Sequence, residues 1–365
     1  MWPDRRLIDL LEIEHPLVLA PMAGIGTVGL AAAVCEAGGL GSIGCGTMEP
    51  ALAAETIRGL RGLTRRPINV NFFCHVPAKA DACLELAWYH RLARYYRELG
   101  IDRKLPLPGT DLAPFGEALC AIVENARPEV VSFHFGLPDP ALLSRVKAAG
   151  CRVLSSATTV EEALWLEARG VDAIIAQGYE AGGHRGTFLA IDVDRAMASQ
   201  AGTLALVPQI VDAVRVPVIA AGGIADGRGI AAALALGAAA VQIGTAFLLC
   251  PETATLSLFR DALRQARRRA TVVTNVFTGR PARVLPNRLT LEMGAILPGL
   301  PDFPLPLGAL LPLRARAEQL GSSDFTSLWA GQMAAWAQEM PARALALTLA
   351  TQAIERLKHF DARIP

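Results

Sequence analysis

The sequence predicts an α/β protein built on a (β/α)8 TIM barrel, with an additional, mostly helical lobe. Three observations support this fold class. Short apolar runs of strand type recur eight times, segments of helical pattern separate them, and glycine or proline marks many of the boundaries. Eight strands that alternate with helices favour parallel βα units, and that number favours a closed barrel over an open sheet. A doubly wound sheet, with some strands wrongly assigned, is the alternative.

The strands are expected where apolar residues run without polar alternation, because a strand buried on both faces shows none. The sixth run illustrates this, since it stops at Gln177-Gly178 and a polar loop follows. The eight runs are Leu17–Ala20, Leu40–Ile43, Ile68–Val70, Val130–Phe133, Arg152–Leu154, Ala173–Ala176, Val218–Ala220 and Ala240–Ile243.

The helices are expected from periodicity and from residues that begin or end helices. Thr159 is a suitable N-cap, and glycines follow several of the helical segments as stop signals. Longer connections hold additional helices. The segments are Thr27–Ala37, Ala51–Leu63, Ala82–Leu99, Phe115–Ala126, Pro140–Ala149, Val160–Arg169, one within Ser199–Val214, Asp226–Leu236 and Thr253–Ala270.

The domain organisation follows from where the βα alternation is interrupted. A long connection follows the third strand, and after Arg280 the pattern changes to proline-rich stretches joined to helical pieces. We therefore predict a barrel over residues 1–270, with a helical insertion at about 76–128, and a mostly helical region over 271–365 that covers the barrel mouth.

Composition excludes several classes of function. A formal net charge of +1 gives no basis for binding nucleic acid or an anionic membrane surface. No apolar stretch reaches the length of about 18 residues that a transmembrane helix needs. The first residues carry acids where a signal peptide has its apolar core, so we expect a cytoplasmic protein. The seven cysteines are scattered without a CxxC pair, and no His/Asp/Glu cluster suggests a metal.

The turns after the last two strands are glycine-rich. Gly222-Gly223 follow the seventh strand, and Gly244-Thr245 follow the eighth. Backbone N–H groups at such turns, helped by the start of a helix near Asp226, form a cradle for an anion, and barrels often bind phosphate at this place. The alternative is that these glycines only permit tight βα turns. Because both turns share the pattern, we favour a phosphate site.

Amide side chains end two of the other strands. Asn71 and Gln177 can donate and accept hydrogen bonds together, which suits the edge of a heteroaromatic ring that carries N–H and C=O groups. The alternative for both is capping of loop backbone. Met22, after the first strand, lies either against such a ring or in the core.

Histidines are the candidate catalytic groups. His184 follows Gly182-Gly183 on a loop without hydrophobic period, so we expect a role in catalysis or substrate binding rather than in the core. His134, at the end of the fourth strand, either lines the substrate pocket or packs. Glu180 and Arg185 are expected to pair and shape the loop.

The motifs around these residues resemble those of the nitronate monooxygenases, over nearly the whole chain. The matching segments are APMAG, NVNFF, SFHFGLP, IIAQGYEAGGHRG, PVIAAGGIADGRG, VQIGTAFL, VFTGRPAR, PNRL and LWAGQ. The AQGxEAGGHRG block is specific to the bacterial type of this family, whereas the glycine turns are shared with other FMN barrels.

The resemblance implies an FMN-dependent barrel that oxidises alkyl nitronates. In that family O2 reoxidises the flavin, and an aldehyde or ketone and nitrite are formed. His184 would face the reactive edge of the flavin. Carried over by position, Met22, Asn71 and Gln177 would contact the flavin, and Gly182, Gly183, Gly222, Gly223, Gly244 and Thr245 would hold the phosphate region, with Gln242 nearby.

Two rival functions stay open at this point. A flavin-dependent enoyl-ACP reductase or NAD(P)H:quinone reductase uses the same scaffold, but Gln177 and the HRG ending of the loop favour the oxygenase. A flavin-binding protein without turnover, or a subunit that only docks onto a partner, is a different class, and the intact His184 argues against it. The oligomeric state, a homodimer included, is not decided by the sequence.

Overall fold

Eight parallel strands form a barrel at the centre of the computed structural model, which describes residues 2–102, 112–190, 192–268 and 270–361. Their order is β1-β9-β8-β6-β5-β4-β3-β2, and a parallel bridge between Val18 and Leu40 joins the two ends of that order. All eight predicted strands and the barrel fold are confirmed. The strands are β1 (Leu17–Leu19), β2 (Gly41–Gly44), β3 (Ile68–Phe73), β4 (Val130–His134), β5 (Arg152–Ala157), β6 (Ala173–Gln177), β8 (Val218–Ala221) and β9 (Ala240–Ile243).

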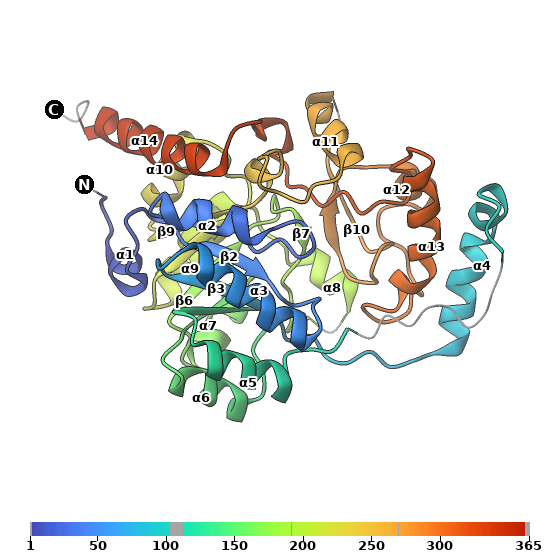
Figure 1. Ribbon diagram of the computed structural model, residues 1–365, viewed down its shortest axis with the longest axis horizontal. Helices are drawn as coiled ribbons and strands as arrows, with labels where there is room; N and C mark the ends of the chain where they lie inside the picture. Colours follow the sequence, from blue (N-terminus) through green and yellow to red (C-terminus); the bar gives the residue numbers. More distant parts are fainter. Residues whose placement is uncertain (1, 103–111, 191, 269, 362–365) are drawn as a thin grey trace.

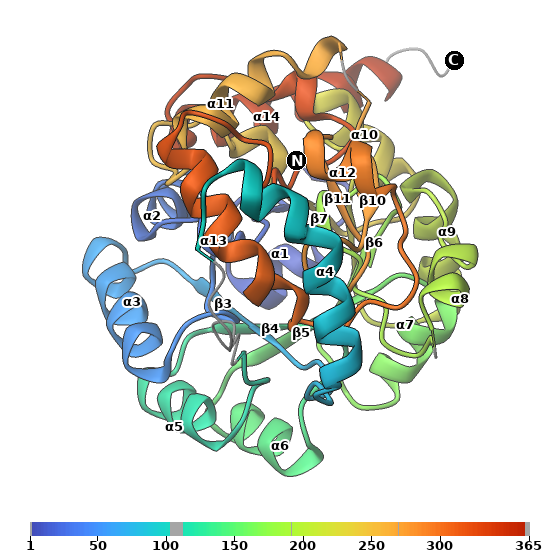
Figure 2. The same cartoon turned by 90° about the vertical axis from the view of Figure 1, so that its right-hand side faces the viewer.

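Helices surround this barrel as an outer ring (Figure 2). Side chains cap several of them: Thr159 does so as predicted, and Thr27 and Asp226 likewise accept hydrogen bonds from N–H groups in the first turn. The helices of the ring are α2 (Val28–Glu36), α3 (Pro50–Leu63), α5 (Glu117–Ala126), α6 (Pro140–Ala148), α7 (Val160–Glu167), α8 (Val193–Ala198), α9 (Thr203–Ala213) and α10 (Gly227–Ala235). Helix α1 (Arg6–Leu11) precedes β1 and lies at the centre of that view, behind the barrel.

The helix predicted for Thr253–Ala270 is shorter than expected. It consists of α11 (Ser257–Arg264) and the 3-10 turn η2 (Ala266–Arg268). The Arg260 guanidinium donates to the carbonyl oxygens of Leu249 and Cys250, at 2.9 and 2.8 Å, and so holds the preceding residues as a turn. Backbone carbonyl oxygens before α11 therefore accept from Arg260 instead of beginning a helix.

A second hydrophobic core lies beside the barrel, in what we call the lobe: α4 (Ala82–Glu98), β10 (Val272–Thr274), β11 (Ala282–Val284), α12 (Arg288–Met293) and α13 (Pro306–Gln319). Figures 1 and 2 show α4 and α13 side by side over the barrel mouth. The core of the lobe is largely aromatic, with Trp88, Tyr95, Phe277 and Phe325 among its most buried side chains.

The lobe also contains a small sheet that the sequence analysis did not predict. β10 and β11 have three residues each, too few for a clear pattern, and β7 (Gly183–His184) completes the order β10-β11-β7. Because β7 belongs to the loop after β6, one strand of the lobe sheet is supplied by the barrel.

The predicted boundaries of the insertion and of the C-terminal region differ from how the helices pack. Helix α4 of the insertion belongs to the core of the lobe, whereas α5 packs on α3 and α6 of the barrel. The last helix, α14 (Ala342–Asp361), packs on α2 and α10 of the barrel rather than over its mouth. Its close approach requires Gly227, where a Cβ atom would lie 2.4 Å from the Cβ of Gln352. Residues 103–111 of the insertion and 362–365 of the C-terminal region lie outside the described residues.

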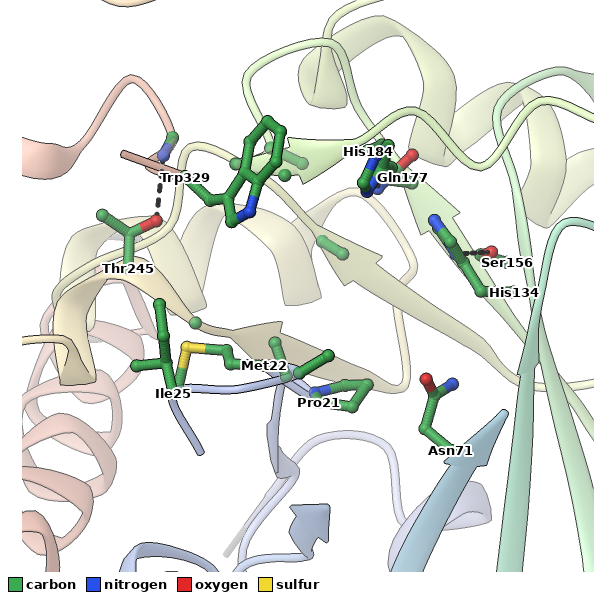
Figure 3. Close-up of a pocket in the computed structure, with 18 of the residues that line it drawn as sticks. Pro21, Met22, Ile25, Asn71, His134, Ser156, Gln177, His184, Thr245 and Trp329 are labelled. Carbon is green, nitrogen blue, oxygen red and sulfur yellow. Dashed lines mark hydrogen bonds between the residues drawn. The ribbon is translucent and has the colours of Figure 1, made fainter. Parts of the chain in front are cut away.

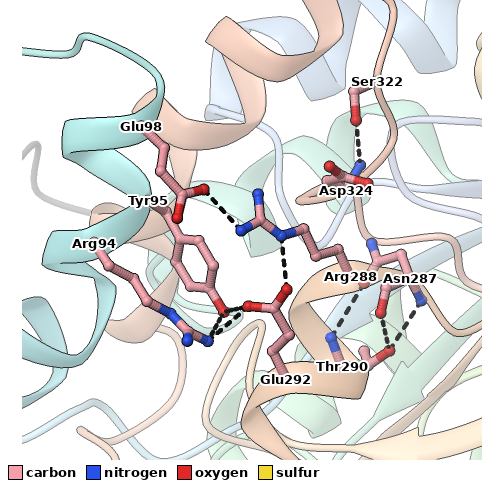
Figure 4. Close-up of polar contacts among 9 residues, drawn as sticks. All are labelled: Arg94, Tyr95, Glu98, Asn287, Arg288, Thr290, Glu292, Ser322 and Asp324. Carbon is pink, nitrogen blue, oxygen red and sulfur yellow. Dashed lines mark hydrogen bonds and ion pairs between the residues drawn. The ribbon is translucent and has the colours of Figure 1, made fainter.

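Polar contacts fasten α4 to the lobe. Figure 4 shows Arg94 and Tyr95 of α4 at the carboxylate of Glu292, and Glu98 at the guanidinium of Arg288. Both ion pairs span 2.7 Å. In the interior, Trp88 Nε1 donates to the carbonyl oxygen of Pro306 at 3.1 Å. The insertion is therefore joined to the C-terminal region by packing and by charge. Within the described residues, no helix combines the length and apolar character needed to cross a membrane.

Candidate active site

A cavity of about 330 Å³ lies between the carboxyl ends of the barrel strands and the lobe (Figure 3). Such a volume is in the range of small-molecule and cofactor sites. Every predicted site residue lines it: Met22, Asn71, His134, Gln177, Gly182, Gly183, His184, Gly222, Gly223, Gln242, Gly244 and Thr245. Residues distant in sequence are thus brought to one place, and their individual roles stay predictions. The lobe contributes Thr278, Phe303, Leu307 and Trp329 to the same wall.

His184 is held in this wall by the lobe. Its backbone pairs with Ala282 of β11, and its Nε2 atom lies 2.8 Å from Oγ1 of Thr278. The rings of Trp329 and Phe303 stand 5.0 and 5.4 Å from the imidazole, measured between centroids. Burial, and then the positive charges nearby, lower the pKa of His184 to about 3. The imidazole is therefore neutral at physiological pH.

Gln177 braces the loop that carries His184. Its Nε2 donates to the carbonyl oxygen of His184 at 2.9 Å, and its Oε1 accepts from the N–H of Gly186 at 2.8 Å. The alternative that the sequence left open, capping of loop backbone, is thus what this amide does. Gln177 also lines the cavity, and its contact with a flavin stays a prediction.

Arg185 and Glu180 shape the loop, but they do not pair with each other as we expected. The Arg185 guanidinium donates to the carbonyl oxygens of Gln177 and Gly178, both at 2.7 Å. Glu180 accepts from the N–H and the hydroxyl of Thr203, both at 2.8 Å. The two side chains therefore fix different parts of the structure. Arg185 binds the backbone at the end of β6, and Glu180 binds the first residue of α9. Arg283 of β11 adds a clamp from the lobe, donating to the carbonyl oxygen of Tyr179 at 2.8 Å.

His134 and Asn71, at the ends of β4 and β3, also line the cavity. Nδ1 of His134 lies 2.7 Å from the hydroxyl of Ser156, and burial lowers the pKa of His134 to about 3. Asn71 donates from Nδ2 to the carbonyl oxygen and the hydroxyl of Ser132, at 3.1 and 3.0 Å. These bonds use the amide nitrogen and leave Oδ1 available as an acceptor for a ligand.

The glycine turns bring three loops into contact. Gly222 has a φ of +110°, and a Cβ there would lie 2.8 Å from the backbone nitrogen of Ala181. A Cβ on Gly182 would lie 2.5 Å from the backbone nitrogen of Gly331, whose N–H donates to Oγ1 of Thr245 at 2.9 Å (Figure 3). The late LWAGQ segment is therefore part of the wall at the glycine turns.

One part of the expected phosphate cradle needs correction. The start of α10 was expected to help, but Asp226 already accepts hydrogen bonds from the N–H groups of Arg228 and Gly229. An anion at this place would depend on the loop backbone at the glycine turns instead. Two observations are consistent with a ligand there: Oε1 of Gln242 is buried without a partner in the described chain, and a Cβ on Gly183 would meet nothing within 4 Å.

Sequence reasoning missed the contribution of the lobe. Thr278, Phe303 and Trp329 were not predicted as site residues, although two of the matching segments, VFTGRPAR and LWAGQ, contain two of them. Their similarity to the family was the signal that could have identified these site residues. Neither segment follows a strand of the barrel, so the rule that active sites lie at strand ends does not apply to them. Among the described residues, no cluster of three or more His, Cys, Asp or Glu could hold a metal ion.

Comparison with known proteins identifies similar chains of the same length. A family model described as nitronate monooxygenase matches residues 4–352. A nitronate monooxygenase of Pseudomonas aeruginosa is 46% identical over 94% of this chain and 97% of its own length, and one of Paraburkholderia phytofirmans is 45% identical over 98% of each.

Solved structures give a consistent result. A nitroalkane oxidase from Streptomyces ansochromogenes is 40% identical, with a TM-score of 0.88 over 97% of this chain and 99% of that one. FabK from Thermotoga maritima is 32% identical, with a TM-score of 0.74 over the whole of both chains. An enoyl reductase domain of MlnA from Bacillus amyloliquefaciens, at 12% identity, shares the fold.

Proposed function

This chain belongs to the nitronate monooxygenase family, and from that premise we propose that it oxidises alkyl nitronates with O2. The products are an aldehyde or ketone and nitrite, and the cofactor is FMN. The observation that carries the proposal is the cavity itself. It unites the glycine turns after β8 and β9 with a neutral histidine from the loop after β6, inside a chain whose family match covers almost its whole length.

FMN fits the residues present. The glycine turns at Gly222-Gly223 and Gly244-Thr245 would hold its phosphate, and the unpartnered Oε1 of Gln242 is a free acceptor on the same wall. Oδ1 of Asn71 can accept from a ring N–H, and Met22 offers an apolar surface for the ring. When bound, FMN supplies the electron transfer that the protein side chains cannot provide.

His184 would bind the nitronate. Because Nε2 is engaged with Thr278, Nδ1 is the ring nitrogen that remains for substrate, and it has no hydrogen-bond partner in the described chain. When the Thr278 hydroxyl donates to Nε2, the neutral ring carries its proton on Nδ1 and can donate to an anionic oxygen. The rings of Phe303 and Trp329 make the surroundings of this nitrogen apolar, which strengthens such a bond.

A reductase that uses NAD(P)H is the second candidate, because FabK matches the whole chain and an enoyl reductase domain shares the fold. A reductase must admit a nicotinamide to the flavin. The higher identity to a nitronate monooxygenase, 46% against 32% for FabK, favours the oxygenase.

Three measurements on the purified protein test the proposal. An absorbance spectrum typical of oxidised flavin, and FMN in the supernatant after denaturation, would establish the cofactor. Oxygen uptake and nitrite release with a panel of alkyl nitronates would establish the reaction. Anaerobic mixing with NADH separates the two candidates, since rapid bleaching of the flavin, together with no oxygen uptake on any nitronate, would assign the protein to the reductases.

A further inference from the structure

Arg280 is a half-buried cation beside the proposed active site, and the described residues give it no counter-ion. It lies in the turn between β10 and β11, and its guanidinium carbon is 4.2 Å from the centroid of the Phe135 ring and 5.8 Å from that of Phe303. Its Nη1 atom is buried without a hydrogen-bond partner, and in the part of the chain that the structure describes it forms no ion pair. A buried charge left unpaired is costly, so its retention calls for an explanation.

The turn is built to keep Arg280 in this place. Gly279 has a φ of +86°, and a Cβ there would lie 2.6 Å from the carbonyl oxygen of Pro301. The backbone of the turn therefore lies against the segment that leads to Phe303. This close approach fixes the guanidinium against the two rings.

Three imidazoles surround the same two rings. The Phe135 centroid is 4.4 Å from that of His134 and 5.9 Å from that of His184, and the Phe303 centroid is 4.9 Å from that of His75. Arg280 thus faces the histidines across aromatic rings rather than touching them. Its positive charge adds to burial in lowering the pKa of each imidazole.

The other charges that face this cluster leave it positive. Arg185 adds its charge to that felt by His134. Glu162 of α7 is the carboxylate that acts on Arg280, but its oxygens already accept from the N–H groups of Thr158 and Phe188, both at 2.7 Å. Glu162 therefore fixes loop backbone and does not form an ion pair with Arg280. The arginines that act on the three imidazoles, Arg280 and Arg185, are both positive, and a field of that sign attracts an anion.

We propose that Arg280 is a positioning residue that makes the cavity select an anionic substrate, acting through its field across Phe135 and Phe303. This inference rests on the proposed oxidation of nitronates, and it names the group that distinguishes the nitronate anion from the neutral nitroalkane. The same field disfavours protonation of the imidazoles. None of them therefore transfers a proton to the bound anion and neutralises it. A purely packing role for Arg280 is the competing explanation.

The test compares FMN-loaded variants. Arg280→Gln removes the charge, Arg280→Lys keeps it but loses the flat stacking, and Arg280→Met is a second neutral variant if Gln prevents folding. Arg169→Gln is the matched control, because Arg169 also stacks on a ring, 3.7 Å from the centroid of Trp165, on the outside of the barrel. Each variant is assayed with an alkyl nitronate for kcat, KM and their dependence on pH.

We expect the neutral variants to raise KM for the nitronate about tenfold or more, with a smaller change in kcat. The reason is that these variants lose the electrostatic attraction that helps to bind the anion. Their acid limb should move to higher pH, since imidazoles without the neighbouring cation take up a proton more readily. Arg280→Lys should stay close to the wild type in both respects. An Arg280→Lys protein impaired as much as the neutral variants would establish packing instead and overturn the proposal.

A second readout does not depend on turnover. Titration of the histidine side chains by NMR, in protein with FMN bound, should show the resonances of His75, His134 and His184 moving to a higher pKa in Arg280→Gln and unmoved in Arg169→Gln. Unchanged titration together with an unchanged KM would overturn the inference while leaving nitronate oxidation intact. Absence of nitronate oxidation in the wild type would instead refute the proposed function.

Discussion

The barrel and the lobe build one cavity from different materials. The barrel core is aliphatic, with valine, isoleucine, leucine and alanine on strands that are buried on both faces. The lobe core is aromatic, and two of its side chains donate to backbone carbonyl oxygens, Trp88 to Pro306 at 3.1 Å and Tyr96 to Ala309 at 2.6 Å. Toward the cavity the barrel presents glycines and amides, whereas the lobe presents rings, Thr278 and a nearby cation. We infer that the barrel retains the cofactor and that the lobe decides which substrate reaches it.

His184 is where the two regions meet, and its removal should have the largest effect. It belongs to the chain of the barrel but to the sheet of the lobe. His184→Asn should lower kcat for a nitronate by about 10²-fold or more, because one member of a catalytic arrangement is lost. The exposed His90 of α4 provides the control, since His90→Asn leaves the cavity intact. If His184→Asn retained FMN and full activity, the role assigned to this imidazole would be wrong.

Truncation of a large side chain tests whether the two cores unfold together. Trp88 is 1% exposed in the lobe core, and Trp88→Ala should cost about 3–5 kcal/mol locally. We expect hydrogen exchange to lose protection in α4, α12 and α13 while the barrel strands keep theirs. Phe72→Ala, at a fully buried position of β3, is the matched truncation and should expose the barrel strands. Equal loss throughout the chain in both variants would show one cooperative unit.

The pH dependence of stability should also come from the junction of the two regions. The pKa values of His134 and His184 are lowered to about 3 in the folded protein, below the ordinary value of 6.5. Between those values the unfolded chain binds more protons, so the free energy of unfolding should fall as the pH falls through that window. Chemical denaturation at several pH values measures this slope. His134→Gln should reduce it, and an unchanged slope would mean that other groups govern acid stability.

The smallest effect is expected at the surface of the lobe. Arg288 is 33% exposed and pairs with Glu98 and Glu292. Arg288→Gln should lower the free energy of unfolding by about 1 kcal/mol or less, and the loss should shrink at high salt because exposed ion pairs are screened. Thermal unfolding at low and high ionic strength measures it. A loss far above this value, undiminished by salt, would show that the network in Figure 4 is a main support of α4.

The barrel could be predicted from the sequence because its signals are local. Each strand is one apolar run, and glycines follow many of the helices. The residues at the strand ends, from Asn71 to Gly244, followed from the same reasoning because parallel strands end at one edge. Some local signals allowed two interpretations, and there the structure was needed to decide. Gln177, for example, caps loop backbone.

The lobe could not be predicted in the same way because its contacts are long-range. β10 and β11 have three residues each, and the strand they pair with contains two, so no periodic pattern arises. Helix α4 has clear helical periodicity, but nothing local shows that its aromatic face packs against α13, more than two hundred residues later. The position of Arg280 depends on a turn that is fixed by a carbonyl from another segment.

The return of α14 to the barrel limits how the lobe can move. Residues 271–341 leave the barrel after η2 and come back to it at α14, which rests on α2 and α10. The C-terminal part of the lobe is consequently a long connection fixed to the barrel at both ends, and its sheet is joined to the barrel again through β7. If the cavity widens to admit substrate, the movement must be divided into small changes at each of these attachments. Because His184 lies on β7, each change also moves its imidazole.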